Sequence, residues 1–139
     1  MLFKHSYYSK QTEEEIHELV GKSIGFIDRL KMGGIGSQRF LVEEADLEIT
    51  RLLDQQNTPP YTNIELRPKG IIMSFRVKLD NWVLVLPYRK LSVFKSAKAL
   101  TIHQDHWKLK MAPANNASLD LKFFQKLLKI KAESISSIS

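Results

Sequence analysis

Cysteine is absent from this sequence, and its absence excludes disulfide bonds and thiol chemistry. Long apolar runs are absent too, since a run such as WVLVL at 82–86 is far shorter than the ~18 residues that a membrane-spanning helix needs. The first ten residues, MLFKHSYYSK, are too polar to contain the apolar segment of a secretory signal. We therefore expect a soluble protein of a reducing compartment, the cytoplasm.

Recognisable catalytic motifs are also lacking. The glycine-rich stretch MGGIGSQ at 32–38 is not a P-loop, because it follows a predicted helix and lacks the lysine and hydroxyl residue that bind phosphate. We interpret it as a helix end and a connector. His103, Asp105 and His106 offer ligand types that zinc accepts, but they flank a predicted turn and no fourth ligand accompanies them. The sequence thus predicts a non-enzymatic protein without a cofactor or a metal.

Apolar periodicity predicts the fold class. The chain has 139 residues, 43% of them apolar, which is enough for a single domain with a sizeable core. Helical spacing predicts a helix over 12–31 and an amphipathic helix over 118–132, with Ser118 as the N-cap of the second and a frayed tail behind it. Alternation between residues 40 and 111 predicts antiparallel strands. We predict an α+β domain over 1–139: a curved antiparallel sheet or partly closed barrel, capped by the C-terminal helix, with the N-terminal helix packed outside.

Individual strands can be located within the β-rich region. From Ala45 onward apolar and polar residues alternate, which predicts a strand. IIMSFRVKL at 71–79 also alternates, so one face of this strand is expected in the core and the other in solvent. Asp80 and Asn81 are typical turn residues and predict a hairpin into the following apolar run. Pro87 predicts an edge, a bulge or a bend at the end of that run, because it cannot donate a ladder hydrogen bond.

Charge is distributed unevenly along the chain. Residues 1–66 contain 7 Lys and Arg against 11 Asp and Glu, a net charge of −4, whereas residues 67–139 contain 14 against 4, a net charge of +10. A basic half can bind phosphates, anionic lipids or an acidic protein. It can equally pack against the acidic half of its own chain, for example against the glutamates of the first helix.

The second half of the chain carries a resemblance. WVLVLPYRKLSVFKSAKALTIHQDHWKLKM, followed by SLDLKFFQKLLKIKAE, resembles small bacterial members of the pleckstrin-homology-like barrel superfamily in the order of its elements. The resemblance covers roughly residues 40 to 132 and leaves the first helix as an addition. It implies a meander of strands whose end is plugged by the last helix. Many members bind phosphoinositides, peptides or proteins, so the resemblance also implies a binding function.

Four cations are the main candidates for a binding surface: Arg76, Lys78, Lys108 and Lys110. Each alternates with core residues of a predicted strand, so each is expected to point into solvent. If the two strands share a sheet face, the four side chains form one basic patch that suits phosphates. The alternative is an ordinary solvated face, where Lys and Arg protect sheet edges from aggregation.

Arg89, Lys90 and Lys95 are secondary candidates. They are interleaved with Tyr88 and Phe94, as in proteins that stack bases on aromatic side chains beside basic residues. Phe94 also fits a core position of a strand, and we expect it in the core. The lysines of the last helix are expected on its solvated side rather than on a membrane.

Three functions are compatible with these features. The first is a non-enzymatic binding or adaptor module whose basic surface recognises an acidic protein or an anionic lipid headgroup. The second is nucleic-acid binding, which predicts an affinity that falls steeply with salt. The third is a small enzyme, which requires a closed polar pocket with a perturbed titratable residue. A homodimer through an exposed strand edge is compatible with each of them.

Overall fold

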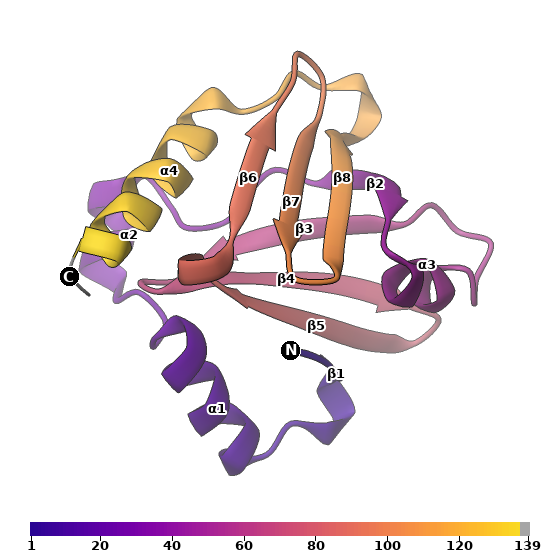
Figure 1. Cartoon of the computed structure of the whole chain (residues 1–139), viewed down its shortest axis with the longest axis horizontal. Helices are drawn as coiled ribbons and strands as arrows, with labels where there is room; N and C mark the ends of the chain where they lie inside the picture. The colour runs from indigo at the N-terminus through magenta and orange to yellow at the C-terminus, as the bar shows by residue number, and fades with distance from the viewer. Residues whose placement is uncertain (137–139) are drawn as a thin grey trace.

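The computed structural model describes residues 1–136 and shows an α+β fold, in which helices surround one eight-stranded antiparallel sheet (Figure 1). The strands are β1 (Leu2–Lys4), β2 (Phe40–Ala45), β3 (Tyr61–Leu66), β4 (Gly70–Val77), β5 (Asp80–Pro87), β6 (Ser92–Lys95), β7 (Leu100–Gln104) and β8 (Trp107–Pro113). The α-helices are α1 (Lys10–Val20), α2 (Phe26–Met32), α3 (Leu47–Leu53) and α4 (Leu121–Ser136), and the 3-10 turns are η1 (His5–Tyr7), η2 (Tyr88–Lys90) and η3 (Ala114–Asn116). The predicted antiparallel α+β class with a C-terminal helix is confirmed.

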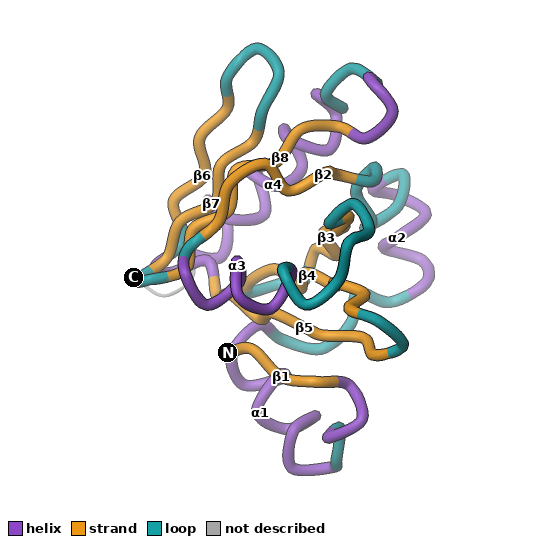
Figure 2. Tube along the Cα trace, turned by 90° about the vertical axis from the view of Figure 1, so that its right-hand side faces the viewer, coloured by secondary structure: helices purple, strands orange, loops and turns teal. Residues whose placement is uncertain are grey.

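The sheet is open and folds over itself. Its strand order is β1-β5-β4-β3-β2-β8-β7-β6, and the edge strands β1 and β6 do not pair with each other within the described residues. β2 joins the two halves, with a shorter ladder to β3 than to β8. Figure 1 shows β6, β7 and β8 running across β3, β4 and β5, and Figure 2 shows the two groups as separate layers. The sheet is therefore not closed into a barrel.

The core lies between the two layers. Met73 and Phe75 of β4 are almost fully buried and belong to the same apolar cluster as Leu109 and Met111 of β8. Ser74, between the first two, is exposed, so the predicted alternation of β4 is confirmed. Each such buried apolar side chain contributes about 1.5–3 kcal/mol. The register of these strands is therefore fixed, because a slip of one residue would exchange the core face for the solvent face.

The helix predicted over 12–31 is in fact two helices. α1 begins after Ser9, whose hydroxyl accepts a hydrogen bond from the backbone N–H of Thr12, and it ends at Gly21. Gly21 has a φ of 85°, which only glycine adopts without strain, so the helix cannot continue there. α2 follows and ends at Gly33 in the left-handed conformation, which confirms that the glycine-rich stretch begins as a helix end.

The strand predicted from Ala45 onward is wrong. β2 ends at this residue, and α3 follows it. The physical reason is Asp46, whose carboxylate accepts a hydrogen bond of 3.1 Å from the backbone N–H of Ile49 and caps the helix. Ile49, Leu52 and Leu53 then lie at helical spacing, and all three are buried.

Two further boundaries differ from the prediction. Asp120, rather than Ser118, caps α4, because its carboxylate accepts a hydrogen bond from the backbone N–H of Phe123. α4 also extends to Ser136, past the predicted end at 132, and the rest of the expected frayed tail lies outside the described residues. The strand β1 was not expected at all, and it pairs with β5 at the sheet edge.

The β4–β5 hairpin turns two residues earlier than predicted. Val77 pairs with Asp80, so the turn consists of Lys78 and Leu79, and Asn81 already belongs to β5 opposite Arg76. Leu79 is consequently 88% exposed rather than in the core. This shift matters for function because it places Lys78 at a hairpin tip.

One buried polar group lowers the stability of the core. Gln104 is buried at the end of β7, and its side-chain oxygen has no hydrogen-bond partner among the described residues. An unpaired buried acceptor costs about 1–3 kcal/mol. We therefore expect Gln104→Met to raise the free energy of unfolding by about 1 kcal/mol in urea titrations. Gln125→Met on the exposed face of α4 is the control and should change it by less than about 0.5 kcal/mol; equal effects would contradict this assignment.

Tyr88 makes the fold sensitive to alkali. Its ring is fully buried, its hydroxyl donates a hydrogen bond of 2.9 Å to the carbonyl of Arg67, and burial raises its pKa above the ordinary value. Above pH ~10 the unfolded chain loses this proton while the folded chain keeps it. The free energy of unfolding should therefore fall by about 1.4 kcal/mol per pH unit from this group. Tyr88→Phe should remove that part of the slope in urea titrations at rising pH, and an unchanged slope would contradict the assignment.

Candidate anion-binding site

The outer face of β3 and β4 contains an open depression that we call the basic hollow. It comprises two adjoining depressions of about 650 and 370 Å³, which share Arg39, Tyr61 and Arg76. The first also contains Gln56, Thr58, Pro59, Lys78 and Leu79, and the second contains Ser37, Thr62, Asn63, Ser74, Phe75 and Asn81. Among the described residues, no acidic side chain lines either part.

Strand pairing places Arg39 in the basic hollow. Phe40, the next residue, is buried in the core, so alternation turns Arg39 toward solvent. β2 pairs with β3 such that Leu41 faces Tyr61. The guanidinium of Arg39 consequently lies over the Tyr61 ring, and its Cζ atom is 3.7 Å from the ring centroid. This cation–π contact orients the guanidinium without neutralising its charge.

Gln56 holds the other two cations in position. Its amide nitrogen donates a hydrogen bond of 2.7 Å to the carbonyl of Arg76, and its side-chain oxygen accepts one from the backbone N–H of Lys78. Lys78 has a φ of 58°, a left-handed conformation that is unfavourable for lysine. The two hydrogen bonds fix the hairpin tip in this conformation, so Arg76 and Lys78 are held against the loop that follows α3.

The basic hollow has an uncompensated positive charge. None of its three cations, Arg39, Arg76 and Lys78, forms an ion pair with another described residue. Asp80, two residues after Lys78 in the chain, is instead paired with Lys4 at 3.4 Å. Three like charges without a local acid raise the electrostatic potential of the depression, which favours an anion from solution.

The structure does not bring all four main candidates together. Arg76 and Lys78 line the basic hollow, whereas Lys108 and Lys110 line a second depression of about 540 Å³ on the outer face of β7 and β8. β3 and β2 lie between β4 and β8, a separation on the order of 14 Å along the sheet. Glu44 also lines the second depression and offsets part of its charge.

Phe94 does not lie in the core, where the sequence analysis predicted it. It is 60% exposed on β6 and lines the second depression, because its pairing with Thr101 puts it on the outer face. Leu91 is buried in its place, and Val93 packs against the core. The second depression therefore combines one exposed aromatic ring with Lys108 and Lys110.

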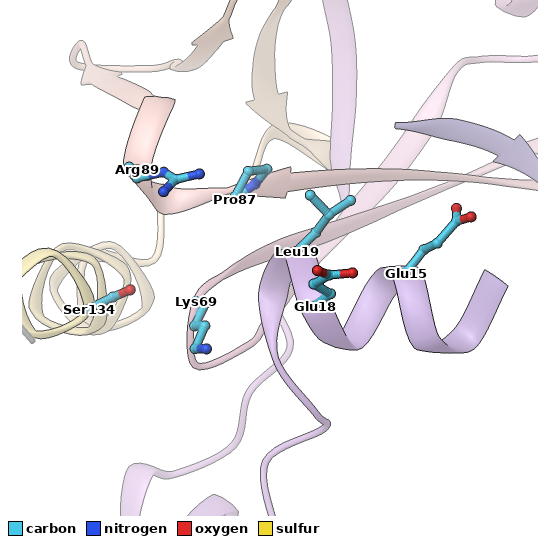
Figure 3. Close-up of a pocket in the computed structure, with 7 residues that line it drawn as sticks. All are labelled: Glu15, Glu18, Leu19, Lys69, Pro87, Arg89 and Ser134. Carbon is cyan, nitrogen blue, oxygen red and sulfur yellow. The ribbon is translucent and has the colours of Figure 1, made fainter. Parts of the chain in front are cut away.

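The secondary candidates are dispersed. Lys90 and Lys95 are exposed, whereas Arg89 lines a cleft of about 560 Å³ between α1, η2 and α4. Figure 3 shows Glu15 and Glu18 of α1 on one side of this cleft and Lys69 and Arg89 across from them. Acidic and basic halves of the chain thus face each other here, as in the intramolecular alternative, and the cleft has less net charge than the basic hollow.

Sequence reasoning missed three residues of the basic hollow: Arg39, Tyr61 and Gln56. Arg39 has a local signal, since it precedes a run that alternates from Phe40. Its stacking on Tyr61 depends on the β2–β3 register, and the role of Gln56 depends on how the loop after α3 packs against the β4–β5 hairpin tip. Both arise from contacts between distant segments.

The residues weighed as zinc ligands lie apart from the basic hollow. His106 contacts Glu48 at 3.1 Å, and His103 lines the second depression. Within residues 1–136 no group of three or more His, Cys, Asp and Glu side chains is arranged to hold a metal ion.

In the same part of the chain, no helix combines the length and hydropathy needed to cross a bilayer. No family model, curated protein or solved structure matches this chain.

Proposed function

We propose that this protein is a non-enzymatic binding module that recognises anionic phospholipid headgroups through the basic hollow. The observation that carries the proposal is the convergence of Arg39, Arg76 and Lys78 in a depression without a lining acid. Guanidinium groups present planar forks of donors that match phosphate oxygens. Polar side chains such as Ser74 and Asn81 supply further donors beside them.

The shape of the basic hollow favours a ligand at the protein surface. The depression is open and shallow, and it lies on the solvent face of a sheet rather than inside the core. A headgroup that projects from a bilayer can enter such a depression while the lipid tails remain in the membrane. The PH-like resemblance stays a prediction.

Nucleic-acid binding is the second candidate, and the exposed Phe94 favours it. This ring lies in the same depression as Lys108, Lys110 and His103, which combines a stacking surface with cations. Such combinations bind single strands with about 1–3 kcal/mol per stacked base. Phe94→Ala should then weaken binding to a single-stranded oligonucleotide, whereas Arg76→Gln should leave it nearly unchanged.

Co-sedimentation with vesicles tests the main proposal. Binding is expected to phosphatidylcholine vesicles that contain phosphatidylserine, with an affinity that falls as salt rises, and none to phosphatidylcholine alone. Inorganic phosphate and a soluble inositol phosphate in competition distinguish a specific headgroup from the phosphate charge alone. Failure to bind anionic vesicles at low salt would overturn the proposal, and selective capture of an acidic protein would then favour the adaptor alternative.

A further inference from the structure

Helix α2 exposes an apolar ridge. Phe26, Ile27 and Leu30 are 72%, 68% and 66% exposed, and none of the residues of α2 is buried. The apolar residues that predicted one long helix over 12–31 are buried only in α1, where Ile16 and Val20 pack against β5. After the break at Gly21 the same periodicity continues on a short helix of which Met32 packs against the core, while Phe26, Ile27 and Leu30 remain exposed.

The charges around this ridge are mainly positive. Lys22, Arg29 and Lys31 lie on or beside α2 and are exposed, against the single acid Asp28. Arg29 additionally donates a hydrogen bond of 2.7 Å from its Nε to the carbonyl of Ile24, which braces the loop that leads into the helix. Cations therefore flank the ridge, and the loop that leads into α2 is held in position.

A short, ordered connection links α2 to the basic hollow. Gly33 and Gly34 close the helix end with hydrogen bonds to Arg29 and Leu30 carbonyls. Ser37, three residues further, donates its N–H to the carbonyl of Ile64 of β3 and lines the basic hollow. Six residues separate Met32 from Arg39, so their Cα atoms lie at most about 25 Å apart. Figure 2 shows α2 and the β4–β5 hairpin tip toward its right-hand side, and Figure 1 shows them toward opposite ends of the long axis, so they face one side of the molecule without being neighbours.

We propose that α2 is a membrane-inserting element whose ridge of Phe26, Ile27 and Leu30 enters the same anionic bilayer that supplies the headgroup to the basic hollow. Lys22, Arg29 and Lys31 contact the anionic headgroups around it. The inference rests on the proposed function and deepens it, because it adds a second, apolar contact with the same lipid surface.

The size of the ridge favours a membrane over a protein partner. A stable protein interface buries about 800 Å² on each partner, far more than three side chains of a two-turn helix provide. Insertion into the headgroup boundary needs no matching surface, since its strength scales with the apolar area that leaves water plus attraction to anionic lipids. The cationic margin matches the sign of that surface.

A single labelled cysteine tests insertion directly, because the natural chain has none to compete. Leu30→Cys carrying an NBD fluorophore should show a blue shift and a several-fold rise in emission when vesicles of phosphatidylcholine and phosphatidylserine are added. Phe94→Cys is the matched control, since it is also exposed and apolar but lies on β6 in the other half of the sheet. Vesicle binding without a response at position 30, or with a response at 94 alone, would overturn the inference and leave the proposed function intact.

A triple variant separates the two contacts. Phe26→Ser, Ile27→Ser and Leu30→Ser together should weaken vesicle binding at least ten-fold and leave its dependence on salt unchanged, because no charge is removed. The fold should persist, since all three side chains are already exposed. If the unchanged protein binds neither phosphatidylcholine vesicles nor vesicles that also contain phosphatidylserine, the proposed function itself fails. If it elutes as a dimer that the triple variant dissociates, with vesicle binding unaltered, the ridge covers a second copy of the chain and the inference is overturned.

Discussion

Replacing Arg39, Arg76 and Lys78 with glutamine in one triple variant is expected to weaken binding to anionic vesicles about 100-fold. Each cation near an anionic bilayer contributes about 1 kcal/mol, so the three contribute about 3 kcal/mol, and every 1.4 kcal/mol is a factor of ten. The loss should be largest at low salt, where screening is weakest. Co-sedimentation of wild type and variant over a series of salt concentrations measures both the affinity and its slope.

The control for this variant has the same net charge. Lys122, Lys129 and Lys131 of α4, changed to glutamine, remove three positive charges outside the basic hollow. The affinity should then fall by no more than about 3-fold, which corresponds to long-range attraction alone. Equal losses in the two variants would show that net charge, and not the basic hollow, determines binding. Circular dichroism and urea titrations establish that both variants fold.

Most strands could be predicted because burial imposes a two-residue period. In β4 and β8 the same side chains that alternate in sequence fill the core, so local pattern and tertiary packing agree. The register and order of the strands could not be predicted in this way. They depend on which segments pair, and β2 lies between β3 and β8, which follow it by about 20 and 60 residues.

The errors have a common physical origin. Where a single polar residue competes with an apolar pattern, the polar residue determined the outcome: Asp46 capped a helix where alternation predicted a strand. Gly21 divided one predicted helix into two. Phe94 differs, since both faces of a strand accept an aromatic residue, and only its pairing with Thr101 places it outside.

The candidate site was predictable in part for the same reason. Alternation along β4 correctly puts Arg76 in solvent, and this follows from the sequence alone. Lys78 reaches the basic hollow only because the turn is at Lys78–Leu79, where Gln56 accepts its backbone N–H. Arg39 and Tyr61 meet through the pairing of β2 with β3. A site assembled by side chains from separate strands is thus a property of the register, which the sequence pattern does not specify.

Replacing Gly70 with alanine is expected to destabilise the protein strongly, although it adds only one methyl group. A Cβ at this position would lie only 2.4 Å from both the carbonyl oxygen of Leu86 and Cγ1 of Val20, and 2.8 Å from the Cα of Pro87. Overpacking costs about 1–3 kcal/mol and more where backbone must move, so we expect a loss of about 3 kcal/mol. Thermal unfolding should shift down by roughly 10 °C, since about 1 kcal/mol corresponds to several degrees for a domain of this size.

Two further variants distinguish overpacking from a general effect of alanine. Gly36→Ala is the control, because nothing lies within 4 Å of its added Cβ, and it should leave the unfolding temperature unchanged or slightly higher. Val20→Ala removes the methyl group that the new Cβ of Gly70→Ala meets. The double variant should therefore be more stable than the sum of the two single changes implies, whereas strict additivity would contradict the clash. The rescue should be only partial, because the new Cβ still meets the carbonyl oxygen of Leu86. This oxygen belongs to the backbone of β5, so no side-chain substitution removes it.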